Sequence, residues 1–387
     1  MPSVPTTSLD LSAAKVVADP YPFFADERAA HPIAWHESTS RWLVFDHASV
    51  SAVQRDRRLG RLWRDREPTD YLEPFNLLHR NQMMENEPPD HTRLRRPVTA
   101  AFNRGHVERL RPRVREIAAE LLAEVEGSAF DVIGAYAEPL PVLVIAELLG
   151  VPTSHADDLR RWSQAIVRMY EVAPTDDTVA AAVAAAEDFA GLVRELVHER
   201  QARPQDDLIS DLAAAGGLTE DEMVASVVLL LNAGHEASVN VFGNGLVALL
   251  LRGLRPTADV PAAGEEMLRF DSALQLFERT AMEAVEVGGV TVEPGQKVAV
   301  LLGSANRDPA VFGAPDQMRL DRAPNPHVAF GVGVHFCLGA PLARMELAES
   351  LAALLAARPG LELVGEPEPR GTFVLRGFRR VLVGGEG

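Results

Sequence analysis

The sequence predicts a mainly α-helical protein with a small β region, arranged around one long central helix and one cysteine loop. The capping box Thr219-Glu-Asp-Glu222 opens a helix that continues without a break to about Leu251, which is unusually long for a globular protein. The glycine-rich stretch from Phe330 to Arg344 contains the only cysteine and leads directly into a helix over 340–358. Alternating apolar residues are confined to a few short segments between turn residues, so strands form only a minor part of the fold.

Composition excludes several classes of function. The 387 residues include 38 basic and 55 acidic side chains, and the net charge of −17 gives no electrostatic support for nucleic-acid binding. Hydrophobic residues make up 47% of the chain, which is enough for a large core. A single cysteine excludes an intramolecular disulfide and fits a reducing cytoplasm. The most apolar runs, over 140–149 and 227–231, are far shorter than a membrane span, and no signal-peptide pattern opens the sequence, so we expect a soluble cytoplasmic protein.

The first half of the chain is predicted to begin with an irregular segment over 1–20. A short β-hairpin over 33–37 and 42–45 follows, and Asp46 is suited to cap the helix after it. Residues 59–89 show no sustained periodicity and are expected to form a long functional loop. Further helices are predicted over 106–126, 138–149, 155–170 and 176–201.

The second half is predicted to place a short helix around Glu266 and Arg269 after the central helix. Residues 285–292 alternate around Gly288-Gly289, which indicates a hairpin with a two-residue turn. A long coil begins near Asn306. The remaining predicted strands lie over 278–281, 298–302, 372–375 and 378–383, the last two paired as a terminal hairpin with its tip at Arg376-Gly377.

Cys337 lies just ahead of a helix N-terminus, where unpaired N–H groups and the helix dipole favour a thiolate. Without a second cysteine, such a thiolate suits a single bond to a soft metal better than a zinc cage. The simplest alternative is a small buried apolar residue, which is what most lone cysteines are. A cysteine hydrolase would need a histidine facing the sulfur, and the short loop constrains His335 too much for that role. Phe336 occupies the last glycine position of a dinucleotide-binding G-x-G-x-x-G pattern, so the loop does not fit that motif.

A second candidate site lies in the segment Asp90-His-Thr-Arg-Leu-Arg-Arg96. At helical spacing His91 and Arg95 share one face, whereas Arg93 and Arg96 point elsewhere. Taken alone, the segment is most simply interpreted as the solvated basic face of a helix.

The middle of the long helix contains Ala233-Gly-His-Glu-Ala-Ser238. A buried glycine followed by an acid is unfavourable in a plain core. The pattern is explained if Gly234 lets a ligand approach the backbone and Glu236 belongs to a proton path. Ser238 is turned about a quarter of the helix away from Ala237. Two roles for the Ser238 hydroxyl stay open, a hydrogen bond back to its own helix and a role in catalysis.

These segments together resemble those of bacterial soluble cytochromes P450. The pattern Phe330-x-x-Gly333-x-His335-x-Cys337-x-Gly339 resembles the haem-binding loop of that family and is the most specific match. The segment over 90–96 resembles the family's D-H-T-R-L-R-R, and residues 233–238 resemble its oxygen-activating A-G-x-[DE]-T. Glu266 and Arg269 resemble its structural E-x-x-R pair. The matching segments follow one another in the expected order from about residue 85 to the C-terminus.

The resemblance implies a single cytochrome P450 domain over residues 1–387, with haem b as the cofactor and Cys337 as the ligand of its iron. The long central helix is expected to lie over the haem, and the cysteine loop and its helix beneath it. Two ionised propionates need charged partners once they leave water, and the arginine fork fits a carboxylate. The residues implied to bind the haem are His91, Arg95, Arg279, His335, Phe330 and Gly339, the four cationic ones through the propionates. The residues implied in oxygen activation are Gly234, Glu236, Ala237 and Ser238.

The resemblance further implies a monooxygenase that inserts one oxygen atom of O2 into a small organic substrate by hydroxylation or epoxidation. A secondary metabolite such as a macrolide, a terpene or a peptide is the implied substrate class. Electrons would come from a ferredoxin or flavodoxin with its NAD(P)H reductase, steered to a basic patch of Arg93, Arg96 and Arg344 on a monomeric protein. Two alternatives stay open, a peroxide-driven haem-thiolate oxygenase and a non-catalytic haem-thiolate sensor.

The sequence departs from the family pattern at Ala237, where an alcohol is usual. The usual donor of the second proton is therefore missing. Three replacements stay open: Ser238 turned inward, an ordered water that bridges to Glu236, and a hydroxyl group of the substrate. Helix geometry favours the water, because it directs Ser238 away from the direction of residue 237. Val332 and Met318 are smaller departures, in the haem loop and in the coil before it.

Overall fold

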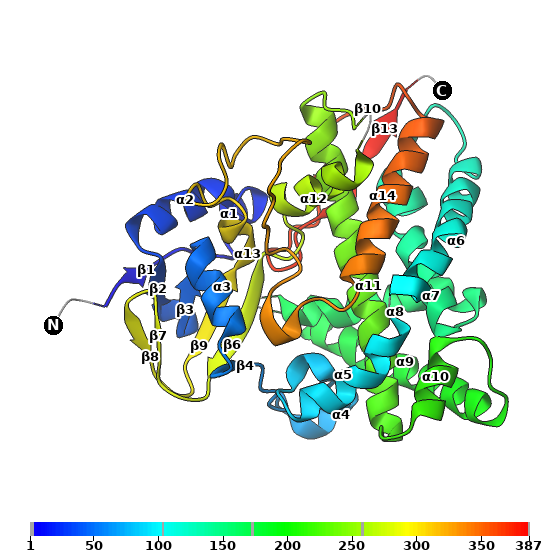
Figure 1. Ribbon diagram of the computed structural model, residues 1–387, viewed down its shortest axis with the longest axis horizontal. Coiled ribbons are helices and arrows are strands. Elements are labelled where there is room, and N and C mark those ends of the chain that lie inside the picture. The colour runs from blue at the N-terminus through cyan, green and yellow to red at the C-terminus, as the bar shows by residue number, and fades with distance from the viewer. Residues whose placement is uncertain (1–3, 103, 172–173, 257–258, 386–387) are drawn as a thin grey trace. The chain divides into compact units, whose positions relative to one another are not determined.

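The chain is described here by a computed structural model, which places residues 4–102, 104–171, 174–256 and 259–385 (Figure 1). These residues form two compact units. The first contains Met1–Arg61, Asn240–Cys337 and Gly365–Val381, and the second contains Leu62–Val239, Leu338–Val364 and Leu382–Gly387. The long helix α11 (Glu220–Leu251) contributes residues to both units. The single domain over 1–387 stays a prediction.

The first unit is built on a sheet with the strand order β1-β2-β3-β9-β6-β4. β1 is parallel to β2 and β3 is parallel to β9, whereas the other neighbouring strands are antiparallel. The predicted hairpin is confirmed, because β2 and β3 pair with Ile33 opposite Val44. The strands of this sheet are β1 (Thr6–Thr7), β2 (Ile33–His36), β3 (Arg41–Val44), β4 (Leu59–Gly60), β6 (Leu276–Ala281) and β9 (Lys297–Leu301).

Alternate residues of the central strands point to opposite faces of this sheet, as the two-residue period of a strand requires. Leu43 and Ala299 pack in the same cluster as Phe24 of α2 (Tyr21–Ala30). Their neighbours Trp42 and Val298 pack on the other face, in the cluster that includes the buried side of α3 (His47–Arg55). Figure 1 shows both helices, in blue, beside the strands.

Local signals in the first unit produce the predicted turns and caps. The Asp46 carboxylate accepts a hydrogen bond from the Ser49 N–H at 2.8 Å and so caps α3. Gly288 and Gly289 have φ values of 55° and 84°, which confirms the tight turn between β7 and β8. The other elements of this unit are α1 (Ala14–Ala18), η1 (Glu37–Thr39), β7 (Val285–Val287), β8 (Val290–Val292), α12 (Val260–Phe270), α13 (Leu302–Ala305), η6 (Gly333–His335), β11 (Glu368–Pro369) and β12 (Phe378–Arg380).

The second unit is mainly helical. The capping box is confirmed at the start of α11, because the Glu222 N–H donates to Thr219 Oγ1 at 3.2 Å and the Thr219 N–H donates to Glu222 Oε2 at 2.9 Å. The helices of this unit are α4 (Thr69–Arg80), α5 (Asp90–Ala101), α6 (Arg104–Ala123), α7 (Pro139–Leu149), α8 (Ala156–Val167), α9 (Asp176–Ala202), α10 (Leu208–Ala215) and α14 (Ala340–Ala357). Its short turns and strands are η2 (Met83–Glu85), β5 (Ala129–Asp131), η3 (Ile133–Ala137), η4 (Thr153–His155), η5 (Arg168–Tyr170), β10 (Glu362–Leu363) and β13 (Leu382–Gly384).

Three expectations about the chain are wrong. Residues 1–20 are not wholly irregular, since β1 pairs with β2 and α1 follows it. The segment over 59–89 is not a structureless loop, because it contains β4, α4 and η2. The terminal hairpin does not form, since β12 pairs with β11 and β13 pairs with β5 and β10. Two of these errors involve a strand partner well outside the segment, since β1 pairs with β2 and β13 pairs with β5.

The helix α11 has the length and hydropathy of a membrane span. However, 72% of its apolar window is buried inside the protein. This burial is typical of the core helix of a soluble protein.

Candidate functional site

Cys337 ends a closed loop in the first unit. Its backbone N–H donates a hydrogen bond to the carbonyl of Phe330 at 2.9 Å, and the Phe336 N–H donates to the carbonyl of Gly333 at 3.1 Å. Gly331 and Gly333 have φ values of 66° and 80°, which residues with a side chain rarely adopt. The loop therefore depends on glycine at these two positions and leaves the thiol partly exposed.

Gly339 behaves differently from the other two glycines of the loop. It precedes α14 with a φ of −77° and accepts the N–H of Ala343 at 2.9 Å. Other residues adopt this backbone conformation readily. Gly339 therefore needs no left-handed backbone conformation at the turn into α14.

Arg279 is a buried cation on β6, in the same unit as Cys337. Its side chain is 2% exposed, and its guanidinium carbon lies 4.8 Å from the centre of the Phe277 ring. The guanidinium carbon of Arg61 lies 4.2 Å from the centre of the same ring. Two guanidinium groups around one aromatic side chain create a local positive potential that suits an anionic ligand. His335, in η6, is partly exposed.

His91 and Arg95 lie one turn apart on α5, in the second unit. His91 is buried and Arg95 is half-buried, whereas Arg93 and Arg96 are exposed, so the predicted separation of the two faces is confirmed. The Arg93 guanidinium donates two hydrogen bonds to the Glu222 carboxylate, at 2.7 and 2.9 Å. These bonds lower the pKa of Glu222. The charge of Arg93 is therefore compensated by a carboxylate within the protein.

One face of α11 is open where most of the helix is buried. Ala233 is exposed, and Gly234, Ala237 and Ser238 are partly exposed, at the spacing of one helical face. A Cβ atom on Gly234 would lie 3.5 Å from the Ile145 side chain, which is an ordinary contact. Packing within the described residues therefore does not require glycine there. This face consists of backbone and small side chains, which permits a close approach by a flat ligand.

Two buried titratable residues stand beside this open face. Glu236 is 4% exposed, and His235 is completely buried. Nδ1 of His235 lies 3.7 Å from Oε1 of Glu236. A buried acid next to an accessible helix face is the arrangement that a proton path needs.

The hydroxyl of Ser238 donates a hydrogen bond to the carboxyl of Glu346, on α14 of the same unit. Glu346 is 6% exposed, and its burial raises its pKa to about 8, although the Ser238 hydrogen bond opposes that rise. Glu346 is therefore mainly a neutral carboxylic acid at pH 7. The partner of Ser238 therefore lies on another helix, α14.

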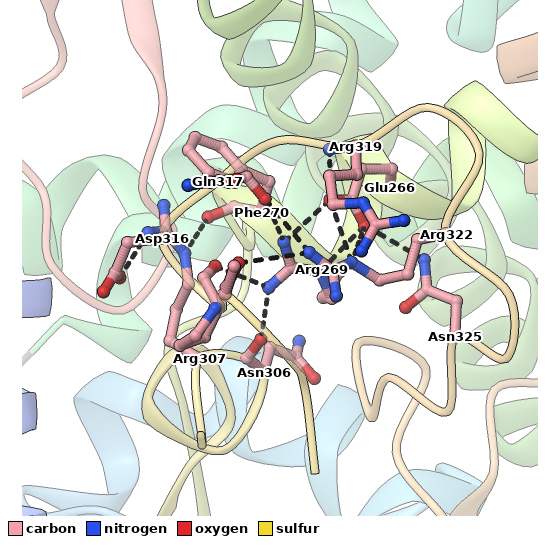
Figure 2. A network of polar contacts seen from close by, with 12 residues as sticks. Glu266, Arg269, Phe270, Asn306, Arg307, Asp316, Gln317, Arg319, Arg322 and Asn325 are labelled. Carbon is pink, nitrogen blue, oxygen red and sulfur yellow. Dashed lines mark hydrogen bonds and ion pairs between the residues drawn. The ribbon is translucent and has the colours of Figure 1, made fainter. Parts of the chain in front are cut away.

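The E-x-x-R pair on α12 is part of a larger buried charge cluster (Figure 2). Arg269 Nε and Nη2 each donate to the Glu266 carboxylate at 2.8 Å, and both side chains are completely buried. Nε of Arg322 donates to the same carboxylate at 3.1 Å. The backbone N–H of Arg319 and the side-chain amide of Asn325 also donate to it, at 2.8 and 3.2 Å. Two cations and further donors thus compensate one buried carboxylate, as burial of a charge requires.

Arg269 also anchors the coil that leads to the cysteine loop. It donates hydrogen bonds to the carbonyls of Asn306 and Pro315, each at 2.9 Å, and of Gln317 at 3.2 Å. Met318, which follows Gln317 in the chain, is buried. The cluster therefore fixes the backbone of this coil.

Comparison with known proteins shows where these features belong. The family model described as "Cytochrome P450" matches residues 260–357. Nocardicin C N-oxygenase of Nocardia uniformis subsp. tsuyamanensis is 40% identical over 370 residues, which cover 91% of this chain and 92% of that protein. The cytochrome P450 monooxygenase PikC of Streptomyces venezuelae is 36% identical over 407 residues, which cover 98% of this chain and 94% of that protein.

Solved structures give the same result. The crystal structure of P450BioI in complex with an acyl carrier protein ligated to hexadec-9Z-enoic acid has a TM-score of 0.92 at 33% identity, over 96% of this chain and 100% of that one. The crystal structure of CalO2 also has a TM-score of 0.92, at 30% identity over 98% of this chain.

The chain belongs to the cytochrome P450 family and has its mainly helical fold with small β-sheets. It is a cytochrome P450 monooxygenase. The family implies a haem cofactor, and bacterial members take electrons from redox partners.

Several residues of the site were not found from the sequence. Glu346 carried a readable signal, because it shares a four-residue spacing with the buried Leu342, Ser350 and Leu354 of α14 and is the acid in that stripe. Arg322 carried none, since its partner Glu266 lies far upstream in the chain and the intervening coil has no period.

Proposed function

We propose that this protein is a haem-thiolate monooxygenase that inserts one oxygen atom of O2 into a small secondary metabolite, by hydroxylation or epoxidation. The observation that carries the proposal is the closed glycine loop that ends in the chain's only cysteine. Relatives support the substrate class through their names, which include Nocardicin C N-oxygenase and Mycinamicin IV hydroxylase/epoxidase.

The residues of both units suit haem b. Cys337 is a single soft ligand in a loop closed by its own backbone. The open face of α11 offers small side chains to a flat ring. Bound haem would supply the activation of O2. The cations proposed to hold its propionates are His91, Arg95, Arg279 and His335, and Phe330 and Gly339 are proposed to lie against it beside Cys337.

Proton delivery is proposed to depend on Glu236 and an ordered water, because Ala237 has no hydroxyl. The Ser238 hydroxyl donates a hydrogen bond to Glu346, and its hydrogen is therefore not directed to a substrate. Glu346, whose pKa is raised by burial to about 8, can replace a proton that Ser238 passes on, which makes the pair a secondary source. Glu236 holds the primary role because it stands directly beside Ala237.

Electrons are proposed to come from a ferredoxin or flavodoxin and its NAD(P)H reductase. The basic patch proposed to steer this acidic carrier consists of Arg93, Arg96 and Arg344, of which Arg93 is hydrogen-bonded to Glu222. The relative solved with a ligated acyl carrier protein adds a second form of substrate to test, one bound to a carrier protein.

The decisive experiment is the spectrum of the reduced protein with carbon monoxide. Wild type is expected to give the Soret band of thiolate-ligated haem, and Cys337→Ala is expected to lose it together with oxygenase activity. A band typical of histidine-ligated haem in fresh wild type would overturn the proposal. Substrate candidates are then screened by the spin-state shift that follows displacement of the haem water, with free and carrier-bound compounds compared.

The same protein distinguishes the two alternatives. Turnover with hydrogen peroxide in the absence of any redox partner would identify a peroxide-driven oxygenase. A sensor would consume no oxygen when substrate and electrons are supplied.

A further inference from the structure

The loop that carries Cys337 is held from outside by a side chain of α3. The Val332 N–H donates a hydrogen bond to Oε1 of Gln54 at 2.9 Å. Gln54 lies in the last turn of α3 and is 4% exposed. Both residues belong to the first unit, as does Cys337.

The backbone of Gln54 touches the same loop. A Cβ atom on Gly333 would lie 2.3 Å from the Gln54 carbonyl oxygen and 3.2 Å from Cα of Arg55, so the end of α3 packs directly against the glycine. On Gly331, a Cβ atom would lie 3.6 Å from Oε1 of Gln54. One residue of α3 thus contacts three consecutive residues of the loop.

The start of the loop has a comparable anchor. The Val328 N–H donates to Oδ1 of Asn306 at 2.8 Å, and the carbonyl of Asn306 accepts from Arg269 in the charge cluster of Figure 2. The backbone is therefore fixed by Asn306 two residues before Phe330, where the loop begins, and by Gln54 within the loop. Gly331 lies between these two anchors and Gly333 directly follows the second, and glycine at both positions gives the backbone a freedom that an external contact must remove.

We infer that Gln54 is a positioning residue for the cysteine loop, which holds the backbone of Gly331–Gly333 and thereby the orientation of Cys337 toward its metal. The inference rests on the proposed role of Cys337 as a haem ligand. It adds a residue that lies outside the cysteine-loop motif and far from it in the sequence. The amide oxygen is the essential atom, because it accepts the Val332 N–H.

The test compares Gln54→Leu with Ser51→Ala in the haem-loaded protein. Leucine keeps the approximate volume of glutamine and removes the acceptor. Ser51 is a matched control, because it is a buried polar residue one turn earlier on α3, and its hydroxyl has no hydrogen-bond partner among the residues that the structure describes. The first measurement is amide hydrogen exchange of the segment 328–337.

Gln54→Leu is expected to exchange the Val332 amide about tenfold faster than wild type, because a buried hydrogen bond is lost. The reduced carbon monoxide complex of this variant is expected to lose its thiolate Soret band faster than wild type does. Ser51→Ala is expected to change neither rate. Gln54→Glu retains an acceptor oxygen and is expected to keep exchange at Val332 slow. This variant therefore still tests the inference if the leucine variant does not fold.

The inference would be overturned if the Val332 amide of Gln54→Leu exchanged at the wild-type rate. It would also be overturned if Ser51→Ala accelerated this exchange equally, since that would indicate general loosening of α3. Should the leucine variant not fold, fast exchange at Val332 in Gln54→Glu would overturn it as well. A wild-type protein without the thiolate band would instead count against the proposed function, because the exchange experiment does not depend on the ligand of the iron.

Discussion

The Ser238 hydroxyl on α11 donates a hydrogen bond to the buried carboxyl of Glu346 on α14. This contact connects the helix proposed for oxygen activation to the helix that follows the cysteine loop. Two roles for the Ser238 hydroxyl stayed open from the sequence, and the contact gives this hydroxyl a defined partner. Because burial raises the pKa of Glu346 to about 8, this partner changes its charge near the pH at which such enzymes work.

The stability of the protein should depend on Glu346 in a defined pH range. The folded state holds the Glu346 proton more tightly than the unfolded state does, so the stabilisation is complete below the ordinary glutamate pKa and is lost as the pH rises to about 8. Glu346→Gln mimics the neutral acid and is expected to have a higher Tm than wild type at pH 8.5, with the difference shrinking toward pH 5. The exposed Glu195 provides the control, because Glu195→Gln should leave the Tm unchanged at both pH values. An equal Tm for Glu346→Gln and wild type at pH 8.5 would contradict the raised pKa.

Coupling of electron consumption to product formation should distinguish the role of Glu236 from that of the Ser238 hydroxyl. Glu236→Ala is expected to lower turnover about a hundredfold or more, as loss of a general acid does. Ser238→Ala should change coupling by less than about tenfold, because it removes a single hydrogen bond to a secondary source. Ala237→Thr should be tolerated and should improve coupling for substrates without a nearby hydroxyl. Haem content and substrate binding are measured alongside peroxide release. If Ser238→Ala alone abolishes turnover while both are intact, Ser238 is the essential donor.

Retention of haem should depend on the buried cation of β6. Arg279→Ala is expected to release haem to apomyoglobin several times faster than wild type, because a propionate removed from water loses its charged partner. Arg279→Lys should restore part of the retention. Lys297→Ala is the control, since Lys297 lies on the adjacent strand with its ammonium paired to Glu278 at 2.7 Å. Wild-type haem retention in alanine variants of Arg279, His91, Arg95 and His335 alike would show that the assignment is wrong.

Reduction by a ferredoxin should depend on charge at Arg96. Arg96→Glu is expected to slow reduction at low salt and to flatten its salt dependence, because the electrostatic steering of an acidic partner is removed. Arg203→Glu, at the exposed end of α9, makes the same charge change elsewhere and should have little effect. Reduction that is indifferent both to salt and to Arg96→Glu would rule out this patch as the docking face.

The stability of the first unit should depend on the second guanidinium of the charge cluster. Arg322→Leu leaves the buried Glu266 carboxylate short of a partner and is expected to lower the free energy of unfolding by about 3–5 kcal/mol. Arg319→Leu is the matched control, because Arg319 reaches Glu266 through its backbone N–H and its side chain is largely exposed. That control should cost less than about 1 kcal/mol in urea unfolding. If both variants lowered the free energy of unfolding equally, the destabilisation would come from the backbone of the coil and not from the Arg322 guanidinium.

Short-range signals in the sequence predicted much of the fold. The capping box at Thr219 and Glu222, the Asp46 cap and the Gly288-Gly289 turn are local patterns whose partners lie within four residues, and all three form as expected. Helix α4 was missed because its buried side includes the polar Asn76 and His79, which interrupts the apolar period. The Asn76 side chain is satisfied by the backbone of Arg66 and His79 by the hydroxyl of Tyr170, contacts that no local pattern reveals.

The candidate site follows the same division. The separation of His91 from Arg93 on the helix was predictable, because it depends on local backbone geometry. Gln54 was not predictable, since it meets Val332 only after distant segments of the chain come together. Motif comparison finds residues at fixed spacing and is blind to a partner on another element.

The order of residues around Glu266 has a consequence for synthesis of the chain. Glu266 and Arg269 leave the ribosome well before Arg322 and Asn325, and Cys337 follows later still. A nascent chain halted in the intervening coil therefore has a carboxylate with one of its two counterions and a core that cannot close around it. The cluster is therefore complete only after the coil as far as Asn325 has been made, and the first unit still lacks its later segment Gly365–Val381 at that point.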